Sequence, residues 1–312
     1  MNIKPSQNTK LYGMNSYFLE MTNLYKNNKM PNKILLSGKK GSGKATLTYH
    51  IINYILSADE DFKYNVEDLS ISSENRSYKL LQNNSHPNFF LVDLIDDKKS
   101  IDIAQIRNMI TYSNKSSFND APRFILIDNI ENLNKNSVNA LLKIIEEPNT
   151  NIYFILIHNN EKKILSTLRS RCLTFKISFS FDETINILNS LLDSDVFNLI
   201  NYNLLNPYNT VGDIINLINF GNEKKINLKE CTVINLLNLL IDNSYYKKNK
   251  PIKEMMINFI ELYFLKLYKI SNSKKKFIKI YQNFIYRIYN VEKFNLDEES
   301  LFLEFKTKLS NG

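Results

Sequence analysis

The sequence predicts an α/β protein that begins as a three-layer α/β/α domain around a five-stranded parallel sheet and continues as all-α structure. Up to about residue 178, short and nearly continuous apolar runs alternate with longer amphipathic segments, as buried parallel strands alternate with crossover helices. Beyond that point the strand pattern fades and apolar residues recur at helical spacing. With 312 residues, of which 43% are hydrophobic, the chain is long enough for two or three domains with cores of their own.

The strands are predicted in the first of these two parts. They correspond to apolar runs at residues 34–37, 89–93, 124–128, 152–157 and 173–177. Helices are predicted at 46–56 and 137–147, and Pro148 ends the second because a proline ring cannot continue a helix comfortably. Residues 57–85 are polar and poorly periodic, so we expect an irregular surface excursion there.

Domain boundaries are predicted near residues 178 and 222. The polar, glycine-bearing stretch 221–225 is the expected hinge between two helical parts. The predicted domains are an α/β domain at 1–178, a small helical domain at 179–222 and a helical C-terminal domain at 223–312. In the last of these, a wide apolar face over 256–267 indicates a helix that buries against neighbouring helices or against another subunit.

Composition narrows the function classes. Cys172 and Cys231 stand far apart, and with only three histidines in the chain they predict neither a zinc site nor a disulfide framework, so no metal is expected. No apolar run approaches the roughly 18 residues of a membrane span, so we expect a soluble, cytoplasmic protein without membrane contact. The net charge of +8 suits an anionic partner such as nucleic acid, and the lysine-rich runs 247–250 and 274–276 are either its contacts or solvated loops.

The strongest local signal follows the first predicted strand and opens a predicted helix. Residues 38–46 read Gly-Lys-Lys-Gly-Ser-Gly-Lys-Ala-Thr, which matches the phosphate-loop pattern G-x-x-x-x-G-K in full. Glycines let backbone N–H groups turn towards a phosphate, the helix N-terminus favours anions, and the lysine reaches the terminal phosphates. The candidate nucleotide-binding residues are Gly38, Gly41, Gly43, Lys44, Thr46 and, from the third predicted strand, Asp128.

Two groups that ATP hydrolysis needs are replaced. Ala45 stands where a Ser or Thr hydroxyl would hold Mg²⁺, and Thr46 is not an obvious substitute because one residue along a helix turns the side chain by about 100°. The strand that ends at Asp128 is followed by Asn129, where ATPases of this type place a glutamate base, and Glu131 is expected to point elsewhere. Losing a general base typically costs about 10²- to 10⁴-fold in rate. The sequence therefore predicts a degenerate site without hydrolysis of its own, and it leaves ATP binding open.

A third motif precedes the last predicted strand. Residues 167–172 read Thr-Leu-Arg-Ser-Arg-Cys, and residues 139–148 read Asn-Ala-Leu-Leu-Lys-Ile-Ile-Glu-Glu-Pro. Together with the phosphate loop, these runs resemble the clamp-loader branch of the AAA+ ATPases over about residues 30 to 178. The resemblance implies an AAA+ phosphate-loop domain, a small helical lid domain and a C-terminal helical collar that joins subunits.

The resemblance also gives the Ser-Arg-Cys arginine a role. In that family this arginine enters the ATP site of the adjacent subunit as an arginine finger, and Arg171 matches its position. From the residues alone, the alternative is that Arg171 pairs with a carboxylate of its own domain. Cys172 is then expected to be a buried packing residue.

Within the branch, the sequence looks like the delta-prime subunits, which keep the finger on an often degraded ATP site. The resemblance implies a stator in a heteropentamer of DNA polymerase III, with gamma- or tau-like motor subunits and a delta-like subunit, that places a sliding clamp on primed DNA in replication. Many relatives carry a four-cysteine zinc module, but residues 57–85 contain no cysteine. Two alternatives remain: an active AAA+ ATPase that holds Mg²⁺ through water or Thr46, and a nucleic-acid-binding module.

Overall fold

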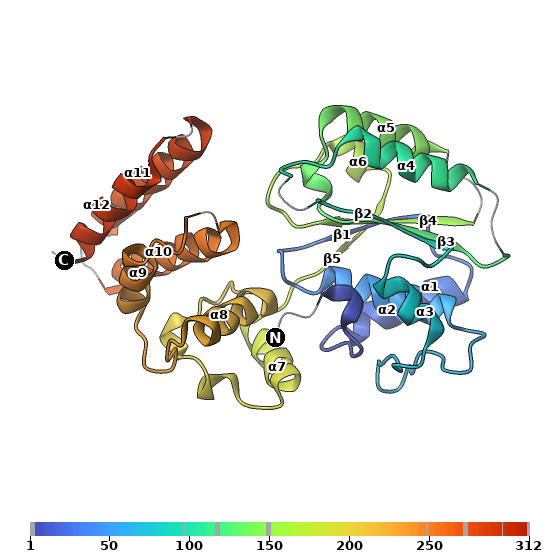
Figure 1. The fold of residues 1–312 in the computed structure, drawn as a ribbon, viewed down its shortest axis with the longest axis horizontal. Helices are drawn as coiled ribbons and strands as arrows, with labels where there is room; N and C mark the ends of the chain where they lie inside the picture. The colour runs from blue at the N-terminus through green and yellow to red at the C-terminus, as the bar shows by residue number, and fades with distance from the viewer. Residues whose placement is uncertain are drawn as a thin grey trace. The chain divides into compact units, whose positions relative to one another are not determined.

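A parallel sheet of five strands forms the centre of the N-terminal part (Figure 1). The strands are β1 (Lys33–Ser37), β2 (Phe89–Val92), β3 (Arg123–Ile127), β4 (Ile152–His158) and β5 (Leu173–Lys176). Their order across the sheet is β2-β3-β4-β1-β5, and every neighbouring pair is parallel. The structure, a computed structural model, describes residues 4–95, 98–115, 119–147, 151–247, 249–270, 274–294 and 296–310. All five predicted strands are present, with ends within one residue of the prediction.

Helices cover both faces of this sheet (Figure 1). One face carries α1 (Asn15–Lys26), α2 (Lys44–Leu56) and α3 (Arg76–Gln82), and the other carries α4 (Ile103–Asn114), α5 (Lys135–Glu146) and α6 (Ser166–Arg169). A separate cluster of buried apolar side chains lies on each face. This arrangement confirms the predicted three-layer α/β/α fold. Pro148, to which the end of the helix at 137–147 was attributed, lies outside the described residues.

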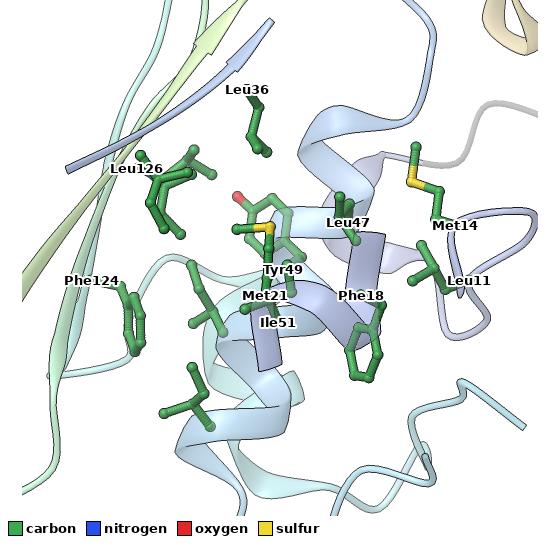
Figure 2. Close-up of a cluster of buried hydrophobic side chains, with 14 of the residues drawn as sticks. Leu11, Met14, Phe18, Met21, Leu36, Leu47, Tyr49, Ile51, Phe124 and Leu126 are labelled. Carbon is green, nitrogen blue, oxygen red and sulfur yellow. The ribbon is translucent and has the colours of Figure 1, made fainter. Parts of the chain in front are cut away.

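The central strands explain why the two clusters form. All residues of β3 are buried, as expected for a strand that is covered on both faces. Because successive side chains of a strand point to opposite faces, Phe124 and Leu126 belong to one cluster and Ile125 and Ile127 to the other. Figure 2 shows the first two among side chains of α1 and α2, such as Met21.

Residues 57–85 form the irregular surface excursion predicted from the sequence only in part: residues 57–75 contain no helix or strand. The rest of the segment contains α3, and the segment buries the side chains of Tyr64, Leu69, Ile71, Tyr78 and Leu81. Two buried asparagines connect this segment to α2, since Nδ2 of Asn53 donates to Oδ1 of Asn75 at 2.8 Å. The same oxygen accepts the backbone N–H of Tyr78 at 2.7 Å and so caps α3. The apolar residues that make the segment fold are too irregularly spaced to give a helical or strand period.

A histidine of α2 lies in the core beneath this segment. His50 is fully buried, and its Nδ1 lies 2.9 Å from the hydroxyl oxygen of Tyr64. Burial in apolar surroundings disfavours the charged imidazolium and lowers the pKa of His50 from its usual value of 6.5 to about 4.

This shift predicts that His50 destabilises the folded state as the pH falls from 6.5 to about 4. In that range the unfolded chain binds the proton and the folded chain does not, so the loss reaches about 3 kcal/mol in the free energy of unfolding. Urea unfolding of the wild-type protein and of His50→Gln, at several pH values, isolates the effect because the other groups titrate alike in both proteins. A difference in unfolding free energy that stays constant over this range contradicts the prediction.

The remaining elements are helical, and the chain divides into two compact units. One unit comprises Met1–Asp193 with Thr210–Gly212, and the other comprises Ser194–Asn209 with Asp213–Gly312. The further helices are α7 (Phe181–Leu192), α8 (Val211–Lys224), α9 (Val233–Asp242), α10 (Lys250–Ile270), α11 (Lys274–Phe294) and α12 (Glu298–Ser310). Short 3₁₀ turns lie at η1 (Pro5–Gln7), η2 (Ile130–Asn132), η3 (Val196–Asn198) and η4 (Tyr202–Leu204).

The stretch predicted as a hinge, 221–225, is instead helical up to Lys224. Gly221 is buried in α8, where Leu228 packs so closely that a Cβ on Gly221 would lie 2.6 Å from it. Packing of this apolar side of α8 therefore outweighs the local preference of glycine and polar residues for a loop. The division of the helical region into domains 179–222 and 223–312 stays a prediction.

Aromatic side chains of α10, α11 and α12 pack together in the second unit. Ring centroids of Phe264, Phe284 and Phe305 lie between 5.0 and 6.3 Å apart. Met256, Phe259 and Phe264 of α10 are buried, so the apolar face predicted over 256–267 is covered at these positions within its own unit. None of the helices in the described part of the chain has the length and apolar character that crossing a bilayer requires.

Candidate functional site

The phosphate-loop sequence forms a tight turn between β1 and α2. Gly41 and Gly43 have φ angles of 77° and 82°, a conformation that side chains with a Cβ rarely adopt. Gly43 is the residue immediately before α2, so its conformation sets the direction in which the helix leaves the loop. The loop thus brings the start of a helix, with its free backbone N–H groups, to the carboxyl end of a central strand.

Lys44, the lysine of the pattern, bonds to its own loop. Its Nζ donates to the carbonyl oxygens of Gly38 at 2.9 Å and Lys39 at 2.6 Å, and it lies 3.3 Å from Oγ of Ser42. Burial lowers the pKa of this ammonium group to about 8, although the charge of Asp128 acts in the opposite direction. A phosphate group would have to compete with these loop oxygens for the lysine.

A segment far along the chain holds the outer side of the loop. The hydroxyl of Thr210 donates to the carbonyl oxygen of Lys40 at 2.9 Å, and the N–H of Gly212 donates to the carbonyl oxygen of Gly41 at 2.9 Å. A Cβ on Gly41 would lie 2.6 Å from Oγ1 of Thr210 and 3.0 Å from Cα of Gly212. The close approach of two backbones therefore requires glycine at position 41.

The side chains beside the loop do not fit a Mg²⁺–ATP hydrolysis site. Ala45 offers no oxygen, and the hydroxyl of Thr46 accepts a hydrogen bond from Nδ2 of Asn8 at 3.2 Å. The charges of Asp128, Glu131 and Glu161 act on Lys44, but Mg²⁺ also needs several well-placed oxygens, and neither Ala45 nor Thr46 supplies a free one here. Among the residues that the structure describes, no group of three or more His, Cys, Asp and Glu side chains is arranged to hold a metal.

Asp128 lies close to a second carboxylate, Asp93, where β3 and β2 end side by side. Burial, followed by the charge of Asp93, raises the pKa of Asp128 to about 7. This group has the opposite effect on stability from His50, because the folded state binds its proton more tightly than the unfolded chain does. The stabilisation of the folded state by Asp128 is complete below the ordinary Asp pKa of 3.8, and it is lost as the pH rises through about 7.

Asn129 stands where a glutamate base would be expected, and its side chain connects Asp93 to Asn159. Its Nδ2 donates to Oδ1 of Asp93 at 2.7 Å, and its Oδ1 accepts from Nδ2 of Asn159 at 2.9 Å. The backbone of Asn129 is left-handed, with φ 56°, which asparagine tolerates better than most residues. Its amide is therefore engaged at both ends, and an amide has no basic group with which to activate water.

Glu131 is the nearest other candidate for a base. It is buried, and its two carboxylate oxygens lie 3.1 and 3.3 Å from the backbone nitrogen of Asn159, whose N–H they accept. These bonds tie the carboxylate of Glu131 to the backbone after β4, while its charge also acts on Lys44. Glu131 connects η2 to the end of β4.

Arg171 and the phosphate loop lie at opposite ends of the parallel strands. Arg171 precedes β5, in which Leu173 pairs with Ile34 near the start of β1. The loop begins after Ser37, at the other end of β1. The three residues from Ile34 to Ser37 along β1 separate these two ends of the strands by roughly 10 Å. Arg171 and the chain's own phosphate loop therefore do not form one site.

The guanidinium of Arg171 is held by two partners. Its Nη2 donates to Oε1 of Glu146 at 2.6 Å, and its Nη1 donates to the carbonyl oxygen of Thr167 at 2.8 Å. The side chains of Arg171 and Glu146 are 35% and 51% exposed. This is the pairing with a carboxylate of its own domain that the sequence left as the alternative. Next to it, Cys172 packs against the core, and burial raises the pKa of its thiol to about 11, as suits a packing residue.

A shallow groove of about 520 Å³ lies between α4 and α5. Apolar side chains such as Ile110 and Ile144 form part of it, and Arg107 and Lys143 bring one exposed cation from each helix. Among the residues that the structure describes, those that line the groove include no Asp or Glu. The groove therefore suits an anionic surface.

Sequence reasoning missed four residues of these sites. Asp93 could have been found, because the second predicted strand ends on it and the carboxyl ends of neighbouring parallel strands meet. Glu146 lies in the motif at 139–148, but the sequence did not identify it as the carboxylate that pairs with Arg171, and Asn159 gave no signal, since both pairings depend on which segments the fold brings together. Thr210 lies in a region with no recognisable motif, 170 positions from its partner Lys40.

Comparisons with known proteins match this chain to one family model and to several related subunits. A sequence model described as "DNA polymerase III, delta subunit" matches residues 14–180, more than half of the chain. The delta' subunit of DNA polymerase III from Buchnera aphidicola subsp. Baizongia pistaciae is 30% identical over 151 residues, 47% of this chain and 44% of the relative. A putative replication factor C small subunit from Acanthamoeba polyphaga mimivirus is 32% identical over 170 residues, 49% of this chain and 42% of the relative.

The chain thus spans less than half the length of these two relatives. Among solved structures, a gamma subunit-related protein from Thermotoga maritima aligns with a TM-score of 0.41 and 16% identity. That alignment covers 84% of this chain and 77% of the other.

Proposed function

Since the chain belongs to the DNA polymerase III delta-subunit family, with delta-prime subunits among its relatives, we propose that it is the stator of a clamp loader. As a stator it does not hydrolyse ATP itself. It donates Arg171 to the ATP site of an adjacent motor subunit, where the guanidinium stabilises the negative charge that develops on the transferring phosphoryl group.

The observation that carries this proposal is the place of Arg171. The side chain is 35% exposed and lies at the ends of the strands opposite the phosphate loop, which supports contact with a nucleotide that is bound to another chain. Arginine suits this role because its planar guanidinium presents several N–H groups to phosphate oxygens at once.

The phosphate loop of this chain supports the proposal that hydrolysis occurs on the partner subunit. Ala45 and Asn129 offer neither a metal ligand nor a base, and Glu131 is occupied by Asn159. If a nucleotide binds at all, it binds through the backbone of the loop and through Lys44, and it stays intact. The nucleotide would then act as a structural ligand.

The proposed partners follow from the family. Gamma- or tau-like motor subunits and a delta-like subunit complete a heteropentamer in the cytoplasm, with the helical part at 223–312 in a collar and 179–222 as the lid. The assembly places a sliding clamp on primed DNA. The groove with Arg107 and Lys143 gives this chain a surface of the right charge for an anionic partner of that kind.

Hydrolysis measurements separate this stator from an active ATPase. We expect no ATP turnover by the purified chain with Mg²⁺, because Ala45 offers no hydroxyl group to hold Mg²⁺ and Asn129 cannot act as a general base. Adding the chain to the gamma-like subunit of the same organism with primed DNA should raise turnover, and Lys44→Ala in this chain should leave that rise intact. If the chain alone hydrolyses ATP, and Lys44→Ala abolishes this hydrolysis, the chain is an active AAA+ ATPase and not a stator.

A further inference from the structure

We propose that Glu146 is a positioning residue for Arg171: it holds the guanidinium in the orientation in which Arg171 meets the partner's nucleotide. This inference rests on the proposed stator function. It adds a residue that acts through Arg171 and does not itself touch the nucleotide.

The geometry supports a fixed orientation. Two nitrogens of one guanidinium are bound, one to the side chain of Glu146 at 2.6 Å and one to the carbonyl oxygen of Thr167 at 2.8 Å. Glu146 is the last residue of α5, and Thr167 lies in α6. Two separate elements of the α/β unit therefore determine the plane of the guanidinium. A guanidinium has five N–H donors, so two bonds leave three for a phosphate.

The exposure of the pair indicates what it does. With side chains 35% and 51% exposed, the ion pair is screened by water, and pairs of this kind contribute little to folding stability. A long arginine side chain, however, loses rotamer freedom when it docks on a phosphate. If Glu146 has already fixed the side chain, less of this freedom is lost at the moment of reaction.

The carboxylate has an uncharged mimic and a matched control. Glu146→Gln keeps an oxygen that accepts the Arg171 N–H but removes the charge, whereas Glu146→Ala removes both. Glu147, the next residue, is also exposed and carries the same charge, so Glu147→Ala tests the effect of charge alone. If Glu146 instead restrained Arg171 by competing with phosphate, both Glu146 variants would speed up hydrolysis.

The experiment measures ATP turnover of the chain together with its gamma-like partner and primed DNA. We expect Glu146→Ala to lower kcat about tenfold with an unchanged KM for ATP, because misplacing a catalytic group affects the transition state more than nucleotide binding. Glu146→Gln should recover most of the rate, and Glu147→Ala should match the wild type. In an Arg171→Ala background, Glu146→Ala should have no further effect.

Each outcome is informative. A rate with Glu146→Ala equal to the wild type, while Arg171→Ala is strongly impaired, overturns the positioning role and leaves the stator in place. Equal losses with Glu146→Ala and Glu146→Gln, or faster turnover with both, also overturn it. If Arg171→Ala itself has no effect, it is the stator function that fails.

Discussion

Replacing Arg171 with alanine should nearly abolish hydrolysis at the ATP site of the adjacent motor subunit to which we propose that this chain donates the arginine. Arginine fingers that act in trans are worth about 10³- to 10⁵-fold in rate in comparable phosphoryl-transfer systems. In the proposed assembly the other ATP sites would keep their own arginine fingers, so the loss should be seen most clearly with the chain and a single gamma-like subunit. Single-turnover hydrolysis of radiolabelled ATP by that pair measures it.

The neighbouring residues supply the controls for this prediction. Arg169 is an exposed arginine two positions earlier, and Arg169→Ala should leave the rate unchanged. Arg171→Lys keeps the charge but not the planar fork, so its rate should lie closer to that of Arg171→Ala than to the wild type. Gel filtration should show that each variant still assembles with its partner. Full activity of an assembled Arg171→Ala complex would falsify the proposal that Arg171 is an arginine finger.

Truncating Phe154 should have the largest effect on stability. This side chain lies on β4, which is paired with β1 on one side and β3 on the other, and it is 1% exposed. Phe154→Ala removes a full aromatic ring from a core that two strands and the helices above them confine, so little collapse into the cavity is possible. We expect the free energy of unfolding to fall by about 3–5 kcal/mol. Such a loss is a large part of the total stability of a typical protein.

Urea unfolding followed by far-UV circular dichroism measures this change. Phe154→Leu serves as the conservative variant and should cost clearly less, because most of the buried volume is kept. Leu165→Ala removes an apolar side chain that is 53% exposed and should shift the stability by less than about 0.5 kcal/mol. Equal losses for Phe154→Ala and Leu165→Ala would mean that β4 is not part of the cooperative core.

The centre of the sheet could be predicted closely from the sequence because its central strands are mostly buried on both faces. A strand such as β3 has no solvent side, so its residues form a continuous apolar run that ends where the strand ends. The segment 57–85 could not be predicted in this way. Its buried side chains, such as Tyr64 and Leu69, are held by turns and by the bond between Asn53 and Asn75, which have no period.

The candidate site shows the same limit. The phosphate loop is contiguous, and its glycine conformations depend on local sterics, so the pattern of residues 38–44 was sufficient to place it. The partners that occupy its groups come from elsewhere: Asn8 for Thr46, Asn159 for Asn129, and Thr210 for Lys40. Such contacts depend on the tertiary fold, which residue identity and spacing alone do not specify.

The strand order has a consequence for how the protein is made. β1 is translated first, yet its neighbours in the sheet are β4 and β5, the last two strands. At about 5–20 residues per second, a ribosome needs on the order of 10 s to travel from β1 to β4. For that time both edges of an apolar strand have no strand to pair with, which exposes the nascent chain to aggregation.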